Sequence, residues 1–533
     1  MLRAIIRKEC QYHLAGFRFR VGAFLAILLA ASSALIAARD YDLRLRTWRE
    51  QVAEHARALS RASVYSYLQP VVVRPPEPLS ILDQGFDAHL GTEVVIHVYT
   101  VPAVAVGGHR GNELLVGVPA LDLTTIVTVV LGLLALLLAG DSVTCERENG
   151  MLRAVLAQGV RRSPLLIGKI LGGILTLALP LGGALLVSLA ILRFATTAEL
   201  TAGHWLRIAA LTVVYVAYLC LMFLVGLVVS LGRRSPSTAL TASVIVWLTF
   251  ILLLPGAVWA TAEDLAGIRE GQRAARAQQE RMAARHEERL AAELRSEPLL
   301  ATFSGHTAVN FSGRAHGAVR YRHGSAAYYD ALSDYFRFEV REGMRYAGEV
   351  FAVQQQIQAR QRRSERFAAG VAALSPAALL DGLSESLAGT SLAEHEQFLA
   401  ACRSYRLELI RYLERKNAFA SWRWFTDDRP ESLTPWPRFL GLAPEDVSET
   451  NAQSLFSRFS DPQVAAQVRR DLEAREHDPS QRLRLDDLPR FHAPSPRLLA
   501  SLQDGAFEAF VLLALNAAAG ALSLSLFRRE LLA

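Results

Sequence analysis

Six runs of apolar, charge-poor residues constrain this chain more than any other feature. Each is long enough to cross a hydrocarbon layer of about 30 Å as a helix of roughly 17 to 25 residues. With 51% hydrophobic and only 20% charged residues, the chain combines membrane and water-soluble parts. We expect a mainly α polytopic membrane protein with six transmembrane helices. The runs cover 21-38, 123-140, 166-192, 207-231, 238-260 and 506-527.

The first run has a second possible interpretation, a signal peptide, because basic residues precede it. Its apolar stretch is longer than the core of an ordinary signal peptide, and five further runs follow. We therefore expect a retained helix.

Arginine and lysine near the runs predict the orientation, because positively charged short loops stay in the cytoplasm. All four basic sets fall on one face, which places both termini and 528-533 inside. The segments 39-122 and 261-505 then lie outside the cytoplasm, as expected for a bacterial inner membrane protein. The sets are Arg3, Arg7, Lys8, Arg18 and Arg20; Arg147, Arg153, Arg161, Arg162 and Lys169; Arg233 and Arg234; and Arg528 and Arg529.

The segment 261-505 is too long and too charged for a loop, so we expect an independent, mostly helical extracytoplasmic domain. Helices are predicted at 263-297, 328-372 and 392-424, with irregular structure from 426 to 496. Cys402 is the only cysteine of the external segments, so we expect no intrachain disulfide there. In the first external segment we predict a helix at 39-63 and one or two strands at 94-106.

The charge distribution argues against nucleic acid as a partner. Lys and Arg total 57 against 51 Asp and Glu, which gives a net charge of +6. Almost all of the positively charged residues are arginines. A nucleic-acid binder concentrates such charge on one face, whereas this chain disperses it.

The common catalytic and nucleotide-binding motifs are missing. The only Gly-Lys pair, Gly168-Lys169, precedes Ile170 and does not form a Walker A loop. Zinc-protease, serine-hydrolase and paired-cysteine patterns are also absent. We expect no catalytic, metal or cofactor site in this chain. His306, His316 and His323 could bind a soft metal, but exposed loop histidines are the expected interpretation.

Residues 1-20 are expected to form an amphipathic helix in the cytoplasmic interface of the membrane, in contact with lipid headgroups. The alternative is a disordered basic lead-in. One helical face carries the apolar side chains, and the other carries basic residues. The first face holds Leu2, Ile5, Ile6, Cys10, His13, Leu14 and Phe17, and the second holds Arg3, Arg7, Lys8 and Gln11.

The cytoplasmic segment 141-165 is the most informative part of the chain. A charged tip, Glu146-Arg147-Glu148, is followed by Gly150, an amphipathic stretch, and Arg161 and Arg162 leading into the third span. This pattern resembles the coupling segment of ABC-2-type transporter permeases. Met151 and Gly159 depart from the family pattern, which favours Thr and Pro there. An ordinary basic cytoplasmic loop is the alternative.

Further segments carry the same resemblance, to the subgroup with a large uncharacterised external domain between spans five and six. They are IRKE near the start, PPEPLSILDQGFD at 75-87, ALDLTTIV at 120-127 and SPSTALTASVIVWLTFILLLP at 235-255. The resemblance implies a type V exporter-like fold. It also implies a second permease subunit, in a homodimer or heterodimer, and separate ABC ATPase subunits that bind ATP and Mg.

The third span contains small residues suited to close helix contact, Gly168 and Gly172, and Pro180, which favours a kink. The centres of the spans contain no ionisable residue. Lys169, Asp122, Asp141 and Glu508 lie near span ends, where they can reach the interface. A proton-coupled carrier is therefore disfavoured, and the partner ATPase is the expected energy source.

Together these features predict the permease subunit of an ATP-driven ABC-2-type transporter that works as an exporter. The alternative is a non-transporting signalling or mechanical protein that relays ATPase movement to its external domain. That domain could contact an extracytoplasmic protein partner. A membrane-bound hydrolase lacks a nucleophile motif.

Overall fold

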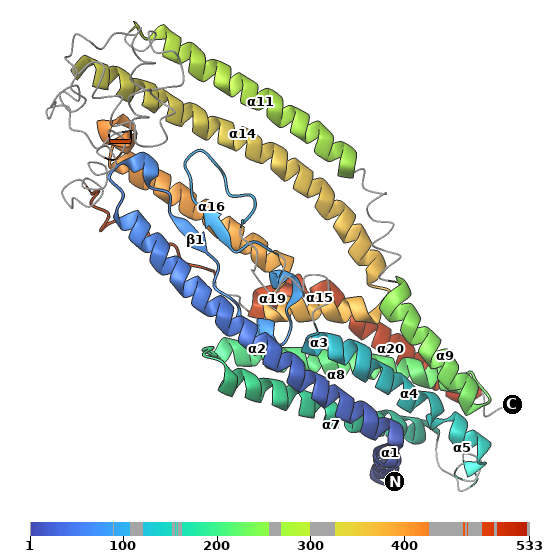
Figure 1. The fold of residues 1–533 in the computed structure, drawn as a ribbon. Coiled ribbons are helices and arrows are strands. Elements are labelled where there is room, and N and C mark those ends of the chain that lie inside the picture. The colour runs from blue at the N-terminus through green and yellow to red at the C-terminus, as the bar shows by residue number, and fades with distance from the viewer. Residues whose placement is uncertain are drawn as a thin grey trace.

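The computed structural model describes most of the chain. The described residues are 2–88, 90–106, 121–151, 162–254, 268–298, 326–425, 482–494 and 498–529, with a few isolated positions between them. Figure 1 shows an elongated molecule in which a helical bundle forms one end and long helices extend away from it. Both termini lie at the free end of the bundle, beside α1 (Leu2–Ala15) and α5 (Thr144–Glu148).

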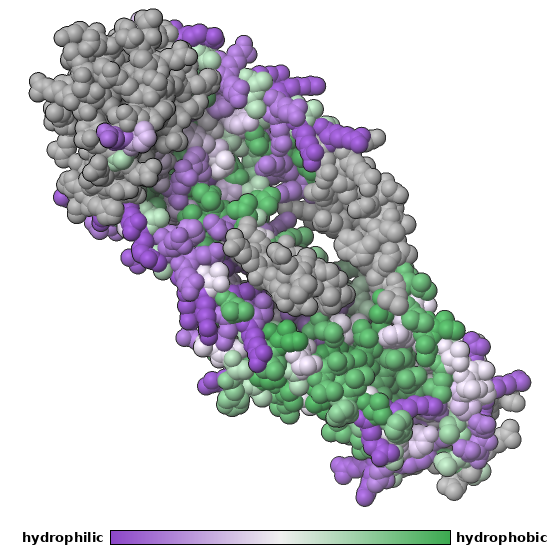
Figure 2. All heavy atoms as spheres, viewed as in Figure 1, coloured by the Kyte–Doolittle hydropathy of each residue, from purple (hydrophilic) through white to green (hydrophobic). Residues whose placement is uncertain are grey.

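Among the described residues, five helical stretches are long and apolar enough to cross a membrane. Figure 2 shows apolar side chains gathered over the bundle, with hydrophilic residues at the end near the termini and over the projecting helices. The spanning stretches are Phe17–Ser60, Leu123–Glu148, Ser163–Ala195, Ala202–Leu231 and Ala506–Arg528. They correspond to α2 (Phe17–Ser60), α3 to α5, α7 (Arg162–Ala195), α8 (Ala202–Leu231) and α20 (Ala506–Arg529).

The fifth predicted span is shorter than expected within the described residues. α9 (Pro236–Leu248) continues into a π-helical turn, η6 (Thr249–Leu253). Together they form an apolar helix over Pro236–Ile251, which is shorter than the other spans. The end of the prediction, 255-260, lies outside the described residues. Of the six predicted spans, the described residues thus contain five at membrane-crossing length and a shorter part of the remaining one, the fifth in sequence.

The second span shows how the bundle compensates for irregular helix. Between α3 (Leu123–Ile126) and α4 (Gly132–Ser142), residues Val127–Leu131 form a π-helical turn, η5. The Tyr218 hydroxyl donates to the carbonyl of Thr128 at 3.0 Å, and Trp247 Nε1 donates to that of Val129 at 3.2 Å. Since lipid offers no hydrogen-bond donor, such side chains help to make irregular backbone tolerable inside the bundle.

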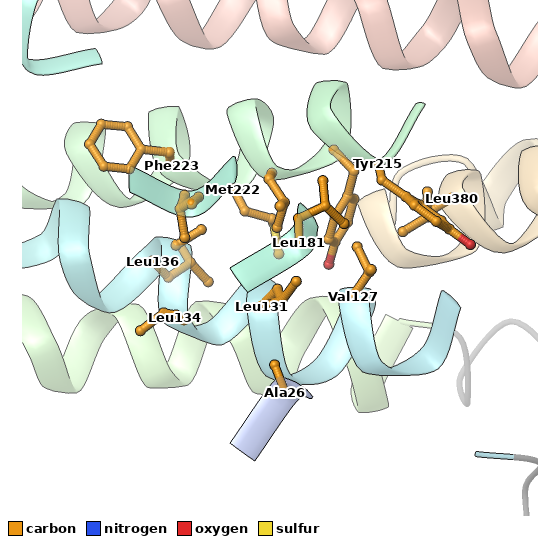
Figure 3. Packing of buried hydrophobic residues seen from close by; sticks show 14 of the residues in the cluster. Ala26, Val127, Leu131, Leu134, Leu136, Leu181, Tyr215, Met222, Phe223 and Leu380 are labelled. Carbon is orange, nitrogen blue, oxygen red and sulfur yellow. The ribbon is translucent and has the colours of Figure 1, made fainter. Parts of the chain in front are cut away.

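The core of the bundle forms where α8 packs against the second span. Figure 3 shows Tyr215, Met222 and Phe223 of α8 near Leu131 and Leu136. All five side chains are buried, and dispersion and exclusion of lipid favour this dense packing.

The helix α2 is much longer than a membrane crossing requires. α2 has 44 residues and is therefore about 66 Å long, but only its first half is apolar. Its polar half leads to a two-stranded antiparallel sheet of β1 (Val71–Val73) and β2 (Glu93–Val95). Trp48 Nε1 donates to the carbonyl of Val73, which holds the sheet on the helix. The described part of the segment also contains three short 3-10 turns: η1 (Tyr65–Tyr67), η2 (Pro78–Ile81) and η3 (Gly85–Ala88).

Four helices form most of the described part of the segment 261-505. α11 and α14 run side by side, and α15 and α16 follow in sequence (Figure 1). The predicted 392-424 helix stops early because Asn417 adopts φ 52°, a left-handed conformation that ends the helix. The bounds are α11 (Ile268–Ser296), α14 (Ala326–Ala372), α15 (Pro376–Ala388) and α16 (Leu392–Arg415), followed by η7 (Ala418–Ala420), η8 (Trp422–Trp424) and α19 (Leu498–Asp504).

The structure corrects the expectation that 261-505 is an independent domain. One buried core joins Val72, Val94 and Ile96 of the first segment to Cys402 and Leu409 of α16. Arg406 donates from Nε to the carbonyl of His97 at 3.0 Å, which adds a polar link. The described parts of 39-122 and 261-505, the segments expected outside the cytoplasm, therefore fold as one module, which we call the external module. Cys402 is a free, buried thiol, in agreement with the expected absence of a disulfide.

The sequence also gave no sign of the role of α15. Although it belongs to the second external segment, α15 packs against the membrane helices α8 and α20. Leu379 and Leu383 share a buried cluster with Leu221 and Leu512. The external module is thus attached to the bundle by hydrophobic contact as well as by the chain itself.

Candidate functional site

The N-terminal helix packs tightly on the third span at two glycines. A Cβ atom at Gly168 would lie 2.6 Å from Cγ2 of Ile5, and one at Gly172 would lie 2.7 Å from Cβ of Glu9. Real Cβ contacts are not this short, so the two glycines are what allow α1 to approach α7. Sequence reasoning selected both residues for close helix contact but did not identify the partner helix.

Lys169, between these glycines, carries a buried charge. The residue is 1% exposed, and its Nζ lies 3.0 Å from Oε1 of Glu9 and 2.9 Å from Oε2 of Glu146. It also donates to the carbonyl of Ser142 at 3.1 Å. A buried ammonium is tolerated only when paired and hydrogen-bonded in this way. The expectation that Lys169 reaches the interface is therefore wrong.

Glu146 links three helices. Its Oε1 accepts from Nζ of Lys8 at 2.6 Å, while its Oε2 faces Lys169. Lys8 and Glu9 belong to α1, Lys169 to α7 and Glu146 to α5. The carboxylate thus points inward, toward two lysines. Sequence reasoning missed Lys8 and Glu9 as members of this network.

The other members of the predicted tip are arranged differently. Nη1 of Arg147 donates to the carbonyl of Arg233 at 2.9 Å, which ties α5 to the turn between α8 and α9. Glu148 and Gly150 are exposed, and Gly150 has φ +70°, which favours glycine. The exposed tip therefore consists of four consecutive residues, Glu148, Asn149, Gly150 and Met151.

Two predicted residues sit at the edge of what the structure describes. Arg161 lies outside the described residues, and Arg162 is described only by its backbone, as the first residue of α7. The expected amphipathic stretch before them is mostly outside the described part as well. Pro180 is buried in α7, which continues through it from Arg162 to Ala195.

Two further contacts secure α1 and the start of α2. His13 is 2% exposed and packs edge-on against Phe223 at 6.5 Å between ring centroids. Burial, and then the charge of Lys169, lowers the pKa of His13 to about 4, so the ring is neutral at physiological pH. Nη1 of Arg18 lies 2.6 Å from Oδ2 of Asp141 at the end of α4. A neutral His13 therefore leaves two lysines to balance Glu9, Lys169 at 3.0 Å and Lys8 at 3.9 Å.

The geometry can transmit a displacement. The paired charges of α1, α5 and α7 would have to separate if one helix moved without the others, and separating buried charges is costly. The ion pairs of Lys169 with Glu9 and Glu146 therefore oppose separation of the three helices. Among the described residues, no group of three or more His, Cys, Asp or Glu could hold a metal ion. His306, His316 and His323 lie outside the described part of the chain.

Comparison with protein families agrees with this architecture. The family model described as ABC-2 family transporter protein matches residues 3–297, more than half of the chain. A domain of unknown function, DUF3526, matches residues 265–492, which covers α11 to α16. A search of curated proteins finds no match. The match to the first family includes α1, α5 and α7, and the chain belongs to the ABC-2 family of membrane transporter proteins.

Proposed function

We propose that this membrane transport component is the permease subunit of an ATP-driven exporter. In this proposal, separate ABC ATPase subunits bind ATP and Mg and dock at the end of the bundle that carries α1 and α5. That end faces the cytoplasm of a bacterial inner membrane, and the external module faces away from it. A second permease subunit completes the assembly, as a homodimer or heterodimer.

The observation that carries the proposal is the double pairing of Glu146 with Lys8 and Lys169. An ATPase that closes around the tip can move α5, and Glu146 passes this movement to α1 and α7. The exposed Glu148 supplies contact with the ATPase, while the inward Glu146 supplies coupling. The two glutamates, two positions apart, thus have different roles.

Two single substitutions test this division. We expect Glu148→Arg to reduce the amount of ATPase that co-purifies with the full chain, because it reverses the charge of the docking surface. Glu146→Gln should leave co-purification intact but reduce ATP-driven output, because the amide cannot neutralise the lysines. Glu408→Gln, exposed on α16, is the control. If Glu146→Gln retains both full complex and full output, the coupling role is refuted.

A second candidate function is mechanical signalling to the outer side. α14 has 47 residues, about 70 Å, and leads directly to α15, which packs on α8 and α20. Movement of these spans would therefore reach an external protein bound to the module. A cargo path between two paired subunits favours transport, and its absence in a structure of the assembled complex favours signalling.

A further inference from the structure

The outer end of α8 carries a buried arginine that sequence reasoning did not single out. Arg207 is 2% exposed. Its Nε donates to the carbonyl of Leu387 at 2.7 Å, and its Nη1 donates to Oε1 of Glu77 at 3.1 Å. Leu387 belongs to the last turn of α15, and Glu77 precedes η2 in the first external segment. One guanidinium therefore joins a membrane helix to both external segments.

Neighbouring groups hold this side chain in place. Nε2 of His204 lies 3.3 Å from Oε1 of Glu77, and its Nδ1 participates in a capping box with Thr201 at the start of α8. The carbonyl of Leu387 is one of the unsatisfied carbonyls at the end of α15, where a cation is favoured. Arg207 is thus a rigidly placed connection.

Near this connection, two buried side chains of opposite charge each have one polar atom without a hydrogen bond. They are Nη2 of Arg207 and Oε1 of Glu394, neither of which has a partner among the described residues. Glu394, in the first turn of α16, is 5% exposed. Burial raises the pKa of Glu394, and the positive charge of Arg207 opposes this rise. The two groups therefore interact electrostatically without pairing.

The turn between α15 and α16 places the two groups in the same region. Leu387, which accepts from Arg207, and Glu394 lie on either side of Gly389, whose φ is +76°. Within the turn, the backbone N–H of Thr390 donates to the carbonyl of Glu385 at 3.0 Å. Leaving a buried cation donor and a buried carboxylate oxygen unsatisfied is unfavourable, so an arrangement in which the two groups pair would be favoured.

We propose that Arg207 is the positioning residue that joins the external module to α8, and that Glu394 becomes its second carboxylate partner when α16 moves toward α8. The present arrangement uses Nε and Nη1, and the second arrangement adds Nη2. The use of this step in a transport cycle rests on the proposed function, whereas the pairing itself does not. The joint would give the external module two positions on the bundle.

If Glu394 had a purely structural role, its substitution would affect stability differently from what the proposed pairing with Arg207 predicts. If Glu394 stabilises the present arrangement, Glu394→Gln lowers the thermal midpoint of the chain. If it acts only in the second arrangement, the substitution leaves the midpoint unchanged or raises it, because an unpaired buried carboxylate is removed. Stability and function are therefore separable for this residue.

The experiment uses the full chain in lipid nanodiscs, together with any ATPase that co-purifies with it. For Glu394→Gln we expect an unchanged or higher thermal midpoint and a loss of ATP hydrolysis by the complex of about fivefold or more. Arg207→Gln should lower both quantities, and Arg207→Lys should recover part of the stability because it retains the charge. Glu414→Gln, exposed on the same helix, should change neither.

Deuterium uptake by residues 385–396 in the chain alone supplies a readout that needs no ATPase. Glu394→Gln should raise this uptake, because the protected second arrangement is lost, while Glu414→Gln leaves it unchanged. Wild-type hydrolysis in Glu394→Gln, unchanged uptake, or a midpoint lowered as in Arg207→Gln would each overturn the inference. Failure of any ATPase to co-purify instead counts against the proposed function, and the deuterium uptake then decides the inference.

Discussion

The Nζ atom of Lys169 lies 2.9 Å from Oε2 of Glu146, inside a bundle where Lys169 is 1% exposed. Because Glu9 binds the same ammonium at 3.0 Å, one cation holds two carboxylates from two other helices. At the opposite end of the bundle, Arg207 similarly joins α8 to Glu77 and to the carbonyl of Leu387. Buried cations thus mark two of the places where a peripheral segment is attached to the spans.

Removing the charge of Lys169 should destabilise the chain strongly. Lys169→Met leaves Glu9 and Glu146 with only the half-exposed Lys8 as a shared cation, and breaking a buried pair costs about 3–5 kcal/mol. We expect a large fall in the thermal midpoint of the purified chain. Lys416→Met is the control, because Lys416 is exposed and pairs at the surface with Asp487, where solvent screens the interaction. Equal falls in the two variants would contradict the buried network.

A larger side chain at Gly172 should displace the N-terminal helix. Its Cβ would lie 2.7 Å from Cβ of Glu9, and both atoms are close to backbone that cannot easily move. We expect Gly172→Leu to separate α1 from α7 and to expose α1 to added protease. Gly182→Leu on the same helix has no atom within 4 Å of the new Cβ and should leave α1 protected. Protection of α1 in both variants would show that the close contact is unnecessary.

Stability should decrease as the pH rises, because of Glu385 on α15. Burial, and then the neighbouring Asp83, Asp381 and Asp122, raises the pKa of Glu385 to about 9. The folded chain therefore holds this proton more tightly than the unfolded chain does. Stability is lost between the ordinary pKa near 4.5 and the folded value near 9.

The thermal midpoint measured from pH 5 to pH 9 checks this expectation. Glu385→Gln removes the titrating group while retaining its shape, so its midpoint should fall less over this interval than that of the wild type. Glu408→Gln, exposed on α16, should behave like the wild type. A wild-type slope in Glu385→Gln would exclude Glu385 as the cause.

Periodicity and apolar length predicted the helical membrane part well, since lipid imposes both on any spanning segment. Gly168 and Gly172 were selected from their spacing alone, but spacing does not name the helix that packs against them. That helix is α1, which was expected in the membrane interface. Its Glu9 and Lys8 become informative only when α1 and α5 are placed beside α7.

Long-range contacts explain the remaining differences. Lys169 and Arg207 both fall near predicted span ends, where an arginine or lysine ordinarily extends to water. Only the folded chain places Glu146 and Glu77, which are far away in sequence, beside them. In the same way, α15 reads as part of a soluble domain, because its partner Leu512 lies more than 100 residues later.

The orientation of the molecule is the last prediction. If the end carrying α1 and α5 faces the cytoplasm, a cysteine at Glu148 should react with an impermeant reagent only after the membrane is opened. A cysteine at Gln355 of α14 should react in intact cells from which the outer membrane has been removed, because the module lies on the other side. Both positions are exposed, so burial does not limit the reaction. Reaction of residue 355 only after opening the inner membrane would invert the proposed topology, and the ATPase docking site would then lie on the external module.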